Sequence, residues 1–301
     1  MELRDLRYLE VLAAELHFGR AAARLHMTQP ALSQALARLE KEIGCPLLQR
    51  HPRGASLTNA GRVLLAETQG VLKTMDIACE LSRRVGRGDA GSVTIGFVDA
   101  AVFDILPPLL RRFRQRFPAV SVTSRQLKSA ELAACVETGQ LDLAFLRREA
   151  AIPEVEYRTI RMERLALAVS RNNPLARARD VAVKDLAEQD FIIPALDGAP
   201  SLHGLSLDIC LGAGFTPRIA AHTISIQVLI EMVAQEIGVA FVVESWGAKR
   251  NPNVVVKELR GVEEFLELAV GFRPEQIPMA AKNLLNLALQ MAPTERLSDT
   301  A

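Results

Sequence analysis

The chain has 301 residues, a length sufficient for two or three compact units with sizeable cores. Hydrophobic residues make up 49% of it and charged residues 24%, as in ordinary soluble proteins, and its longest apolar runs, such as residues 239–243, are too short to span a bilayer. The N-terminus begins with charged residues and lacks an apolar signal core, so we expect a cytoplasmic protein with no membrane partner.

The net charge of +1 conceals an uneven distribution along the chain. Residues 1–88 contain 13 Lys and Arg against 9 Asp and Glu, which gives +4, whereas residues 89–301 contain 23 against 26, which gives −3. A basic N-terminal part joined to a mildly acidic remainder is typical of a DNA reader attached to a domain with another task.

The segment 1–58 has the pattern of a winged helix-turn-helix. A first helix with one buried face is predicted by its apolar positions, which are Leu6, Leu9, Ala13 and Leu16. Two short helices, a tight turn and a two-stranded wing are predicted over residues 18–58.

The helix that begins after Thr28 has the properties of a DNA-reading helix. Thr28 is a suitable N-cap, and Pro30 falls in the first turn, where its missing N–H costs nothing. The buried face repeats at spacings of four, three and four, at Leu32, Leu36, Leu39 and Ile43. The opposite face is short, polar and basic, and comprises Pro30, Ser33, Gln34, Ala37, Arg38 and Lys41. Entry into the major groove requires such a face, with donors and acceptors for base edges and cations for phosphates.

The predicted wing pairs residues 47–50 with 56–58 around a turn rich in positive charge. Arg50 would meet phosphate, and Arg53 either reaches a minor groove or remains a solvated loop residue. The residues expected to contact DNA are Arg20, Thr28, Gln29, Pro30, Ser33, Gln34, Arg38, Arg50 and Arg53. The alternative is that the polar side chains of the reading helix only solvate its surface.

Residues 59–88 predict one long helix, capped by Thr58. A helix of this length would measure about 45 Å, too long to be explained by packing on one small domain. Leu64, Ala78, Leu81 and Val85 keep a helical repeat, with either Val71 and Met75 or Leu72 between them. We interpret it as a dimerisation and linker helix, which the glycine-rich stretch 85–91 ends, with a hinge at 89–91.

Strands alternate with helices after the hinge, which predicts an α/β domain. The first set comprises strands 92–98, 120–126 and 141–146 and helices 105–117 and 130–138. The second set comprises strands 165–170, 191–194 and 239–243 and helices 202–213 and 226–236. Strand 265–273 returns to the first set, and a final helix lies near 279–291. We therefore expect lobe I at 92–163 and 268–301, and lobe II at 164–267.

Residues 1–60 resemble the DNA-binding domain of LysR-type transcriptional regulators. The resemblance is clearest in Ala21-Ala-Ala-Arg-Leu-His-Met-Thr-Gln-Pro-Ala-Leu-Ser33 and Leu39-Glu-Lys-Glu-Ile-Gly44, and extends through Leu47-Leu-Gln-Arg50 to Leu57-Thr-Asn-Ala-Gly61. In layout it covers the whole chain. It implies an N-terminal all-α winged helix-turn-helix with a long linker helix, followed by a C-terminal α/β two-lobed domain with a periplasmic-binding-protein-like fold.

The resemblance also implies partners and a mechanism. The partners are double-stranded promoter DNA, RNA polymerase, a small-molecule effector and further copies of the chain, in a homodimer or homotetramer. A ligand that closes the lobes would change the angle between the reading heads, the bend of the DNA and transcription. Such a ligand shifts this equilibrium only by its difference in affinity for the two states.

In open α/β sheets, ligands bind beyond the carboxyl ends of strands, beside helix N-termini that attract anions. This rule selects the same turns as the effector cleft that the resemblance implies. The expected effector contacts are Asp99, Ala100, Lys128, Ser129 and Arg147 in lobe I, and Pro200, Ser201, Leu202, His203, Thr223 and Ile224 in lobe II. By resemblance, Ser129 and Arg147 match contacts of relatives that sense aromatic carboxylates. The effector could therefore be an organic carboxylate, and we expect no cofactor.

Three of these residues have simpler interpretations. Relatives often have a hydroxyl residue where this chain has Asp99, and a carboxylate there would repel an anion unless Arg147 or Arg148 neutralises it. Asp99 could instead cap the following helix. Arg147 could be a surface ion-pair partner, and His203 a surface histidine with satisfied hydrogen bonds.

An enzyme built on the same lobes is one alternative. The chain contains no glycine-rich nucleotide motif and no Gly-x-Ser-x-Gly, and its five histidines have no metal-ligand spacing. An architectural DNA binder without a ligand would not need the two-lobed domain. We therefore expect a ligand-responsive transcription factor, without catalytic or metal-binding residues.

The cysteines leave one redox hypothesis open. The four cysteines, Cys45, Cys79, Cys135 and Cys210, form no Cys-x-x-Cys pair, which disfavours a zinc site or a disulfide framework. Some LysR relatives sense peroxide through two cysteines of the regulatory domain. Cys210 lies near one of those positions, but Ser201 stands where the other thiol would be required.

Overall fold

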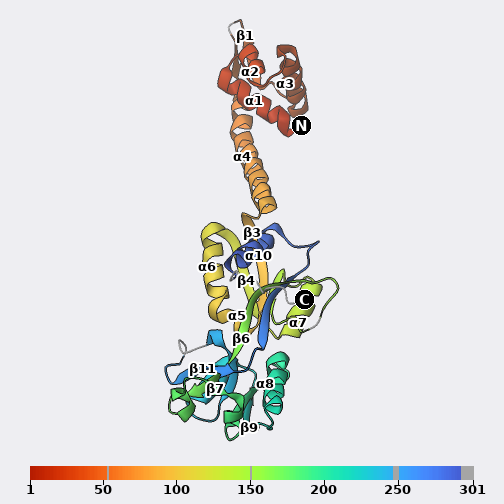
Figure 1. The fold of residues 1–301 in the computed structure, drawn as a ribbon. Coiled ribbons are helices and arrows are strands. Elements are labelled where there is room, and N and C mark those ends of the chain that lie inside the picture. The colour runs from red at the N-terminus through yellow and green to blue at the C-terminus, as the bar shows by residue number, and fades with distance from the viewer. Residues whose placement is uncertain (53, 150, 247–250, 293–301) are drawn as a thin grey trace. The chain divides into compact units, whose positions relative to one another are not determined.

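A computed structural model of the protein describes residues 1–52, 54–149, 151–246 and 251–292. The chain forms two compact units, Met1–Arg84 and Val85–Ala301. The division between them falls inside one long helix, α4 (Asn59–Arg87) (Figure 1). Each unit has its own hydrophobic core.

The first unit is a winged helix-turn-helix. Its helices are α1 (Leu3–Glu15), α2 (Phe18–Arg24) and α3 (Gln29–Ile43), and its wing is the antiparallel pair β1 (Leu48–His51) and β2 (Gly54–Leu57). The helices enclose a leucine-rich core, which includes Leu6, Leu9, Leu12, Leu32, Leu36 and Leu39. Leu16 and Ile43, which were expected on the buried faces, are exposed because they lie at the last turns of their helices.

Local sequence signals determine where these helices begin and end. The Thr28 hydroxyl accepts a hydrogen bond from the N–H of Ala31 at 3.4 Å, as expected of the N-cap of α3. Gly44 ends α3 with a φ of 83°, a conformation that favours glycine. His17 caps α2 in a similar way through its ring Nδ1. Arg53, at the predicted tip of the wing, lies outside the described residues.

Gly61 permits a close contact between the first turn of α4 and the segment leading into the wing. A Cβ atom at this position would lie 2.1 Å from the carbonyl oxygen of Leu47. The N–H of Gly61 also donates to the hydroxyl of Thr58 at 2.9 Å. The start of α4 is therefore fixed by the absence of a side chain as well as by its cap.

Helix α4 has two apolar faces with different surroundings. Leu72 is buried in its own unit, with 4% exposure, whereas Val71 and Leu81 are 50% and 52% exposed. Because Leu72 and Leu81 are nine residues apart, at about 100° per residue they lie on opposite sides of the helix. Leu72, one of the alternative positions in the apolar repeat of the predicted dimerisation helix, is therefore buried within the protomer.

The second unit begins its sheet earlier than expected. Strand β3 (Ala90–Phe97) starts at Ala90, which pairs with Ala119, rather than at Ser92. The connection from α4 is the dipeptide Gly88-Asp89, in which Gly88 has a φ of 75°. The predicted hinge at 89–91 is therefore shorter and lies one residue earlier.

Lobe I is a sheet with helices on both faces (Figure 1). Its parallel strands are β3, β4 (Ala119–Gln126) and β5 (Leu143–Leu146), and β12 (Phe265–Phe272) runs antiparallel to β5. Its helices are α5 (Asp99–Asp104), α6 (Leu106–Arg116), α7 (Ser129–Glu137) and α10 (Met279–Met291). Alternate residues of β5 face opposite layers, since Phe145 packs with α6 and α10 and Ala144 packs with α7.

Strand β6 (Glu156–Ser170) belongs to both lobes. Residues 156–164 pair with β12, and residues 165–170 pair with β10 (Ala240–Val243) and β11 (Val254–Arg260). The resulting sheet has the order β4-β3-β5-β12-β6-β11-β7, with β10 on β6 as well. The sequence pattern predicted only the apolar half of β6, because the other half carries alternating charged side chains.

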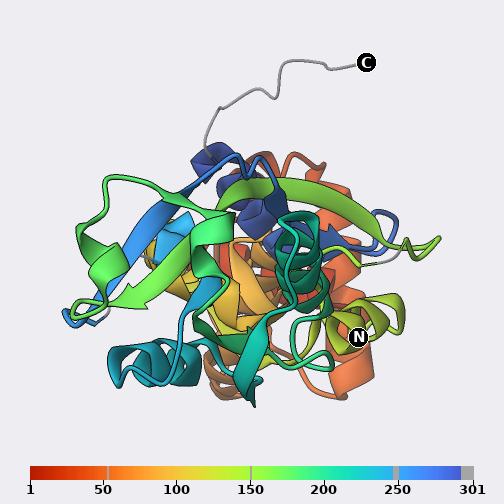
Figure 2. The same cartoon turned by 60° about the horizontal axis from the view of Figure 1, so that its bottom comes forward.

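Lobe II has a separate core and contains a second set of parallel strands. Its remaining strands are β7 (Val181–Ala182), β8 (Asp190–Pro194) and β9 (Arg218–Thr223), and its helices are α8 (Pro200–Gly212) and α9 (Ile226–Ala234). The 3-10 turns are η1 (Pro174–Arg177), η2 (Val183–Leu186) and η3 (Glu244–Trp246). Strands β8 and β9 are parallel, and a bridge between Phe191 and Val239 joins β8 to the start of β10. Figure 2 turns this lobe toward the viewer.

None of the described helices is long and apolar enough to cross a membrane.

We expect Gly61→Ala to destabilise the winged helix-turn-helix, because the new methyl group would overlap the Leu47 carbonyl oxygen. The loss should be about 1–3 kcal/mol, as for other overpacked sites. Gly70→Ala in the same helix is the matched control, since no atom lies within 4 Å of its Cβ position. It should be neutral or stabilise the helix by up to about 1 kcal/mol. Calorimetry of the full chain measures both, and equal effects of the two changes would contradict the close contact.

Candidate functional site

The outer face of α3 is open to solvent in the first unit. Gln29, Pro30, Gln34 and Arg38 are exposed, and Ser33 is half-buried. Leu32, Leu36 and Leu39 on the opposite face lie in the core. The helix therefore presents short polar side chains on a rigidly packed support, which is the arrangement that base recognition in a major groove requires.

The arginines expected to meet DNA have partners within the unit. Arg20 pairs with Glu15, and Arg38 lies 3.0 Å from Asp5, a buried carboxylate whose hydrogen bond raises the pKa of the Arg38 guanidinium. The guanidinium of Arg50 lies 4.7 Å from the ring centroid of Phe18. These contacts orient the arginines on the surface, although they also oppose the release of Arg20 and Arg38 to phosphate.

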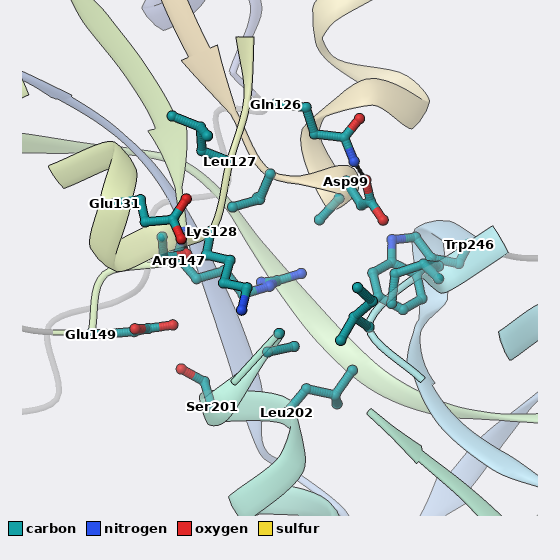
Figure 3. Close-up of a pocket in the computed structure, with 17 residues that line it drawn as sticks. Asp99, Gln126, Leu127, Lys128, Glu131, Arg147, Glu149, Ser201, Leu202 and Trp246 are labelled. Atoms are coloured by element: carbon teal, nitrogen blue, oxygen red, sulfur yellow. Dashed lines mark hydrogen bonds between the residues drawn. The ribbon is translucent and has the colours of Figure 1, made fainter. Parts of the chain in front are cut away.

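A cavity of about 450 Å³ lies between lobes I and II (Figure 3). Three turns of lobe I reach it, after β3, β4 and β5, and three turns of lobe II reach it, after β8, β9 and β10. Five of these turns follow the carboxyl ends of strands in parallel pairs, and the sixth follows β10, which pairs antiparallel with β6. The rule that selected the first five turns from the sequence therefore also explains why they converge.

Most of the expected effector contacts line this cavity. They are Asp99, Ala100, Lys128, Ser129, Arg147, Ser201, Leu202 and Ile224. Pro200, His203 and Thr223 do not line it. Pro200 occupies the first position of α8, while the Nδ1 atom of His203 lies 2.8 Å from the Pro194 carbonyl and the Thr223 hydroxyl bonds within a turn to Ser225. The simpler interpretation of His203, as a histidine with satisfied hydrogen bonds, fits this contact.

Arg147 is held by a buried network at the boundary of the lobes. Its guanidinium donates to Glu163 of β6 at 2.8 Å and to the carbonyl of Glu267 at 3.4 Å, and the two paired side chains are 9% and 2% exposed. The other oxygen of Glu163 accepts from the hydroxyl of Ser245 at 2.6 Å. The N–H of Arg147 donates to Ser129 at 3.3 Å. Arg147 therefore lines the cavity but is not a free anchor for an anion, and neither is it a surface ion-pair partner.

Lys128 forms an ion pair across the cavity mouth. Its ammonium lies 2.8 Å from the carboxylate of Asp197, which precedes α8 in lobe II. The hydrogen bond raises the pKa of Lys128 and lowers that of Asp197. Both side chains are largely exposed, so salt should screen this link between the lobes.

Asp99 does not cap the helix that it begins. It is the first residue of α5, Val98 holds the N-cap position, and no side chain there accepts a capping hydrogen bond. The carboxylate accepts instead from the amide of Gln126, at the end of β4. Asp99 and Trp246 both line the cavity (Figure 3).

Several lining residues were missed by the sequence reasoning. The polar and aromatic ones are Gln126, Glu131, Glu149 and Trp246, and the others are Val98, Leu127, Gly198, Ala199 and Ile226. Trp246 follows the buried strand β10, so the rule of carboxyl strand ends, applied to that strand, would have found it. No sequence signal marks Glu131, which lies on the third residue of α7.

The described residues contain no group of three or more His, Cys, Asp or Glu that could hold a metal ion. The four cysteines are free thiols, and burial in lobe II raises the pKa of Cys210 to about 11. A thiol with that pKa stays protonated near neutral pH and is a poor nucleophile. This environment weakens the redox hypothesis for Cys210.

Comparison with known proteins gives the same division of the chain. Residues 3–62 match the family model "Bacterial regulatory helix-turn-helix protein, lysR family", and residues 86–293 match the model "LysR substrate binding domain". The HTH-type transcriptional regulator AlsR of Bacillus subtilis (strain 168) is 32% identical over 96% of this chain and 95% of its own length. YnfL of Escherichia coli (strain K12), an uncharacterised HTH-type transcriptional regulator, is 34% identical over 82% of this chain and 83% of its own.

Solved structures extend the similarity to the fold of the whole chain. The crystal structure of CbnR, a LysR family transcriptional regulator, has a TM-score of 0.82 and 26% identity, and covers 96% of this chain and 100% of CbnR. Full-length CbnR in complex with its target DNA has a TM-score of 0.81 and 26% identity over 97% of this chain and 100% of CbnR. With both family models matched and a relative above 30% identity over nearly its full length, the chain belongs to the LysR family of transcriptional regulators and is not an enzyme.

Proposed function

We propose that this LysR-type regulator binds promoter DNA as an oligomer and changes DNA bending and transcription when a small molecule occupies the interlobe cavity. The observation that carries the proposal is the cavity itself, because both lobes contribute turns to its lining. A ligand that contacts both lobes binds more tightly to conformations with one angle between the lobes than to conformations with other angles. It can therefore shift the population of conformations by that difference in affinity.

DNA reading is assigned to α3 and the wing. Gln34, exposed near the start of α3, can make a bidentate pair with adenine, and Ser33 can bond to a neighbouring base. Thr28, Gln29 and Pro30 begin the helix, where their backbone lies near phosphate. Arg20, Arg38, Arg50 and Arg53 are proposed to meet phosphates or a minor groove. The complex of the relative CbnR with its target DNA supports this role for the domain.

Assembly is assigned to the exposed apolar face of α4. Val71, Met75 and Leu81 are large apolar residues open to solvent in one chain, and Ala78 lies between them. A second α4 can cover this face, which would bring two reading helices to two half-sites. Association of two such dimers into a tetramer, contact with RNA polymerase and a cytoplasmic location complete the proposal.

The effector response is assigned to movement of the lobes about their two connecting strands, β6 and β12. The Lys128–Asp197 ion pair joins the lobes at the cavity mouth, so a ligand that competes for Lys128 or Asp197 alters the lobe angle directly. An organic carboxylate could bind Ser129 and Arg147 only if Arg147 shared its guanidinium with Glu163. Loss of Arg147 would leave Glu163 buried without its partner, so Arg147→Ala would test folding rather than effector binding.

Gln34→Ala should weaken operator binding by about 1–3 kcal/mol while leaving binding to random DNA nearly unchanged, because a base contact is lost. Arg50→Ala should weaken both, since a phosphate contact is independent of sequence. Fluorescence anisotropy at one fixed salt concentration, with an operator selected from a random library, measures the two affinities. If Gln34→Ala lowers both affinities equally, base reading lies elsewhere.

Leu81→Asp should produce monomers, because the charge would be buried in the dimer seam without a partner. Leu72→Asp should instead lower the stability of the first unit itself, since Leu72 is buried within the protomer. Sedimentation velocity reports the oligomer and thermal unfolding reports the stability. A fully dimeric Leu81→Asp variant would show that the seam uses another face of α4.

Ser201→Trp should abolish the effector response, because the indole would enter the cavity from α8. Leu211→Trp in the same helix is the control, as Leu211 is 57% exposed and does not line the cavity. The measurement is ligand-dependent bending of operator DNA, with a ligand found by an unbiased thermal-shift screen. A normal response of Ser201→Trp would place the effector outside the cavity, whereas a loss in both variants would indicate damage to α8.

A further inference from the structure

The interlobe cavity carries more acidic than basic groups. Asp99, Glu131 and Glu149 line it together with the cations Lys128 and Arg147. Each of these cations is already paired, at 2.8 Å, with a carboxylate. None of the three lining carboxylates forms an ion pair with another described residue. Among the described residues, the lining of the cavity therefore carries more negative than positive charge.

This balance disfavours a simple organic anion. A carboxylate ligand would have to displace Asp197 from Lys128 or Glu163 from Arg147 in order to gain a cation. The displaced Glu163 would remain buried and unpaired, which is costly. The ligand would also face the lining carboxylates as a like charge. Partial burial already raises the pKa of Glu149, as expected where no cation offsets its charge.

Asp99 is the lining carboxylate best placed to bind a ligand. It is half-buried, whereas Glu131 and Glu149 are more exposed, so solvent screens their charges more strongly. Its hydrogen bond comes from the neutral amide of Gln126, which leaves the negative charge in place. The indole of Trp246, 2% exposed, also lines the cavity (Figure 3). A half-buried carboxylate without a cationic partner, in a cavity that an aromatic ring also lines, is a favourable environment for an organic ammonium ion.

We infer that the effector of this regulator is a small molecule with a cationic amine, which binds Asp99, and an apolar body. The apolar body would contact the remaining wall, which includes Val98, Leu127, Leu202, Ile224 and Ile226. The inference rests on the proposed effector function of the cavity, and it names the chemical class of ligand that this function takes.

Three probes of nearly equal size and different charge test the inference. Benzylamine, benzyl alcohol and benzoate carry charges of +1, 0 and −1 at neutral pH on the same ring. Calorimetric titration of the full-length protein should give the tightest binding for benzylamine and the weakest for benzoate. Asp99→Asn should weaken benzylamine binding by about tenfold, as expected for loss of one charge-assisted contact, and leave benzyl alcohol unchanged.

Asp208→Asn is the matched control. Asp208 is an exposed residue of α8 that does not line the cavity, so its substitution should change none of the three affinities. Asparagine at position 99 can still accept from Gln126, and thermal unfolding of Asp99→Asn should match that of the unaltered protein. A decrease in affinity without a change in stability would therefore report the lost charge.

Several results would overturn the inference. Tighter binding of benzoate, failure of benzylamine to bind at millimolar concentration, or equal benzylamine affinity in Asp99→Asn would each do so. The Ser201→Trp variant separates this inference from the proposed function. If benzoate binds tightly and Ser201→Trp abolishes its binding, the cavity remains the effector site and only the ligand class is wrong. If benzylamine binds equally to Ser201→Trp, the cavity is not the site of binding, and both proposals fail.

Discussion

The ion pair between Arg147 and Glu163 is the interaction on which the geometry of the effector unit depends. Glu163 lies on β6 next to the point where this strand passes from one lobe to the other, and its carboxylate binds Arg147 of lobe I and Ser245 of lobe II. Both charged side chains are almost fully buried. An unpaired charge would be costly in this buried position. The pair therefore constrains how the two connecting strands, β6 and β12, approach each other and which groups can face the cavity.

Much of the effector cavity follows from short-range signals in the sequence. Buried parallel strands are recognisable as apolar runs, and their carboxyl ends meet at one edge, so the turns that carry Asp99, Lys128 and Arg147 were predictable. The interaction partners of each side chain were not predictable. Partners such as Glu163 and Asp197 lie 16 and 69 residues away along the chain, and no periodicity reports such pairings. The charged half of β6 was missed for a related reason, since its strand conformation comes from pairing with β12.

The winged helix-turn-helix was more predictable because its determinants are local. A cap, a glycine and a stripe of leucines lie within fifteen residues of α3. The error concerned α4, where a single apolar repeat concealed two faces. Leu72 is buried within its own chain and Leu81 is exposed, and a one-dimensional pattern does not separate a contact within one chain from a contact between two.

The separate hydrophobic cores of the two units have a consequence for protein engineering. No core residue of the winged helix-turn-helix is shared with the effector unit among the described residues, and α4 beyond Leu72 is mostly solvent-exposed. A junction placed in that stretch of α4 would leave both cores intact. Reading heads and sensing domains of different relatives could therefore be recombined there with the helical phase preserved, which offers a route to biosensors that report a chosen small molecule through a chosen promoter.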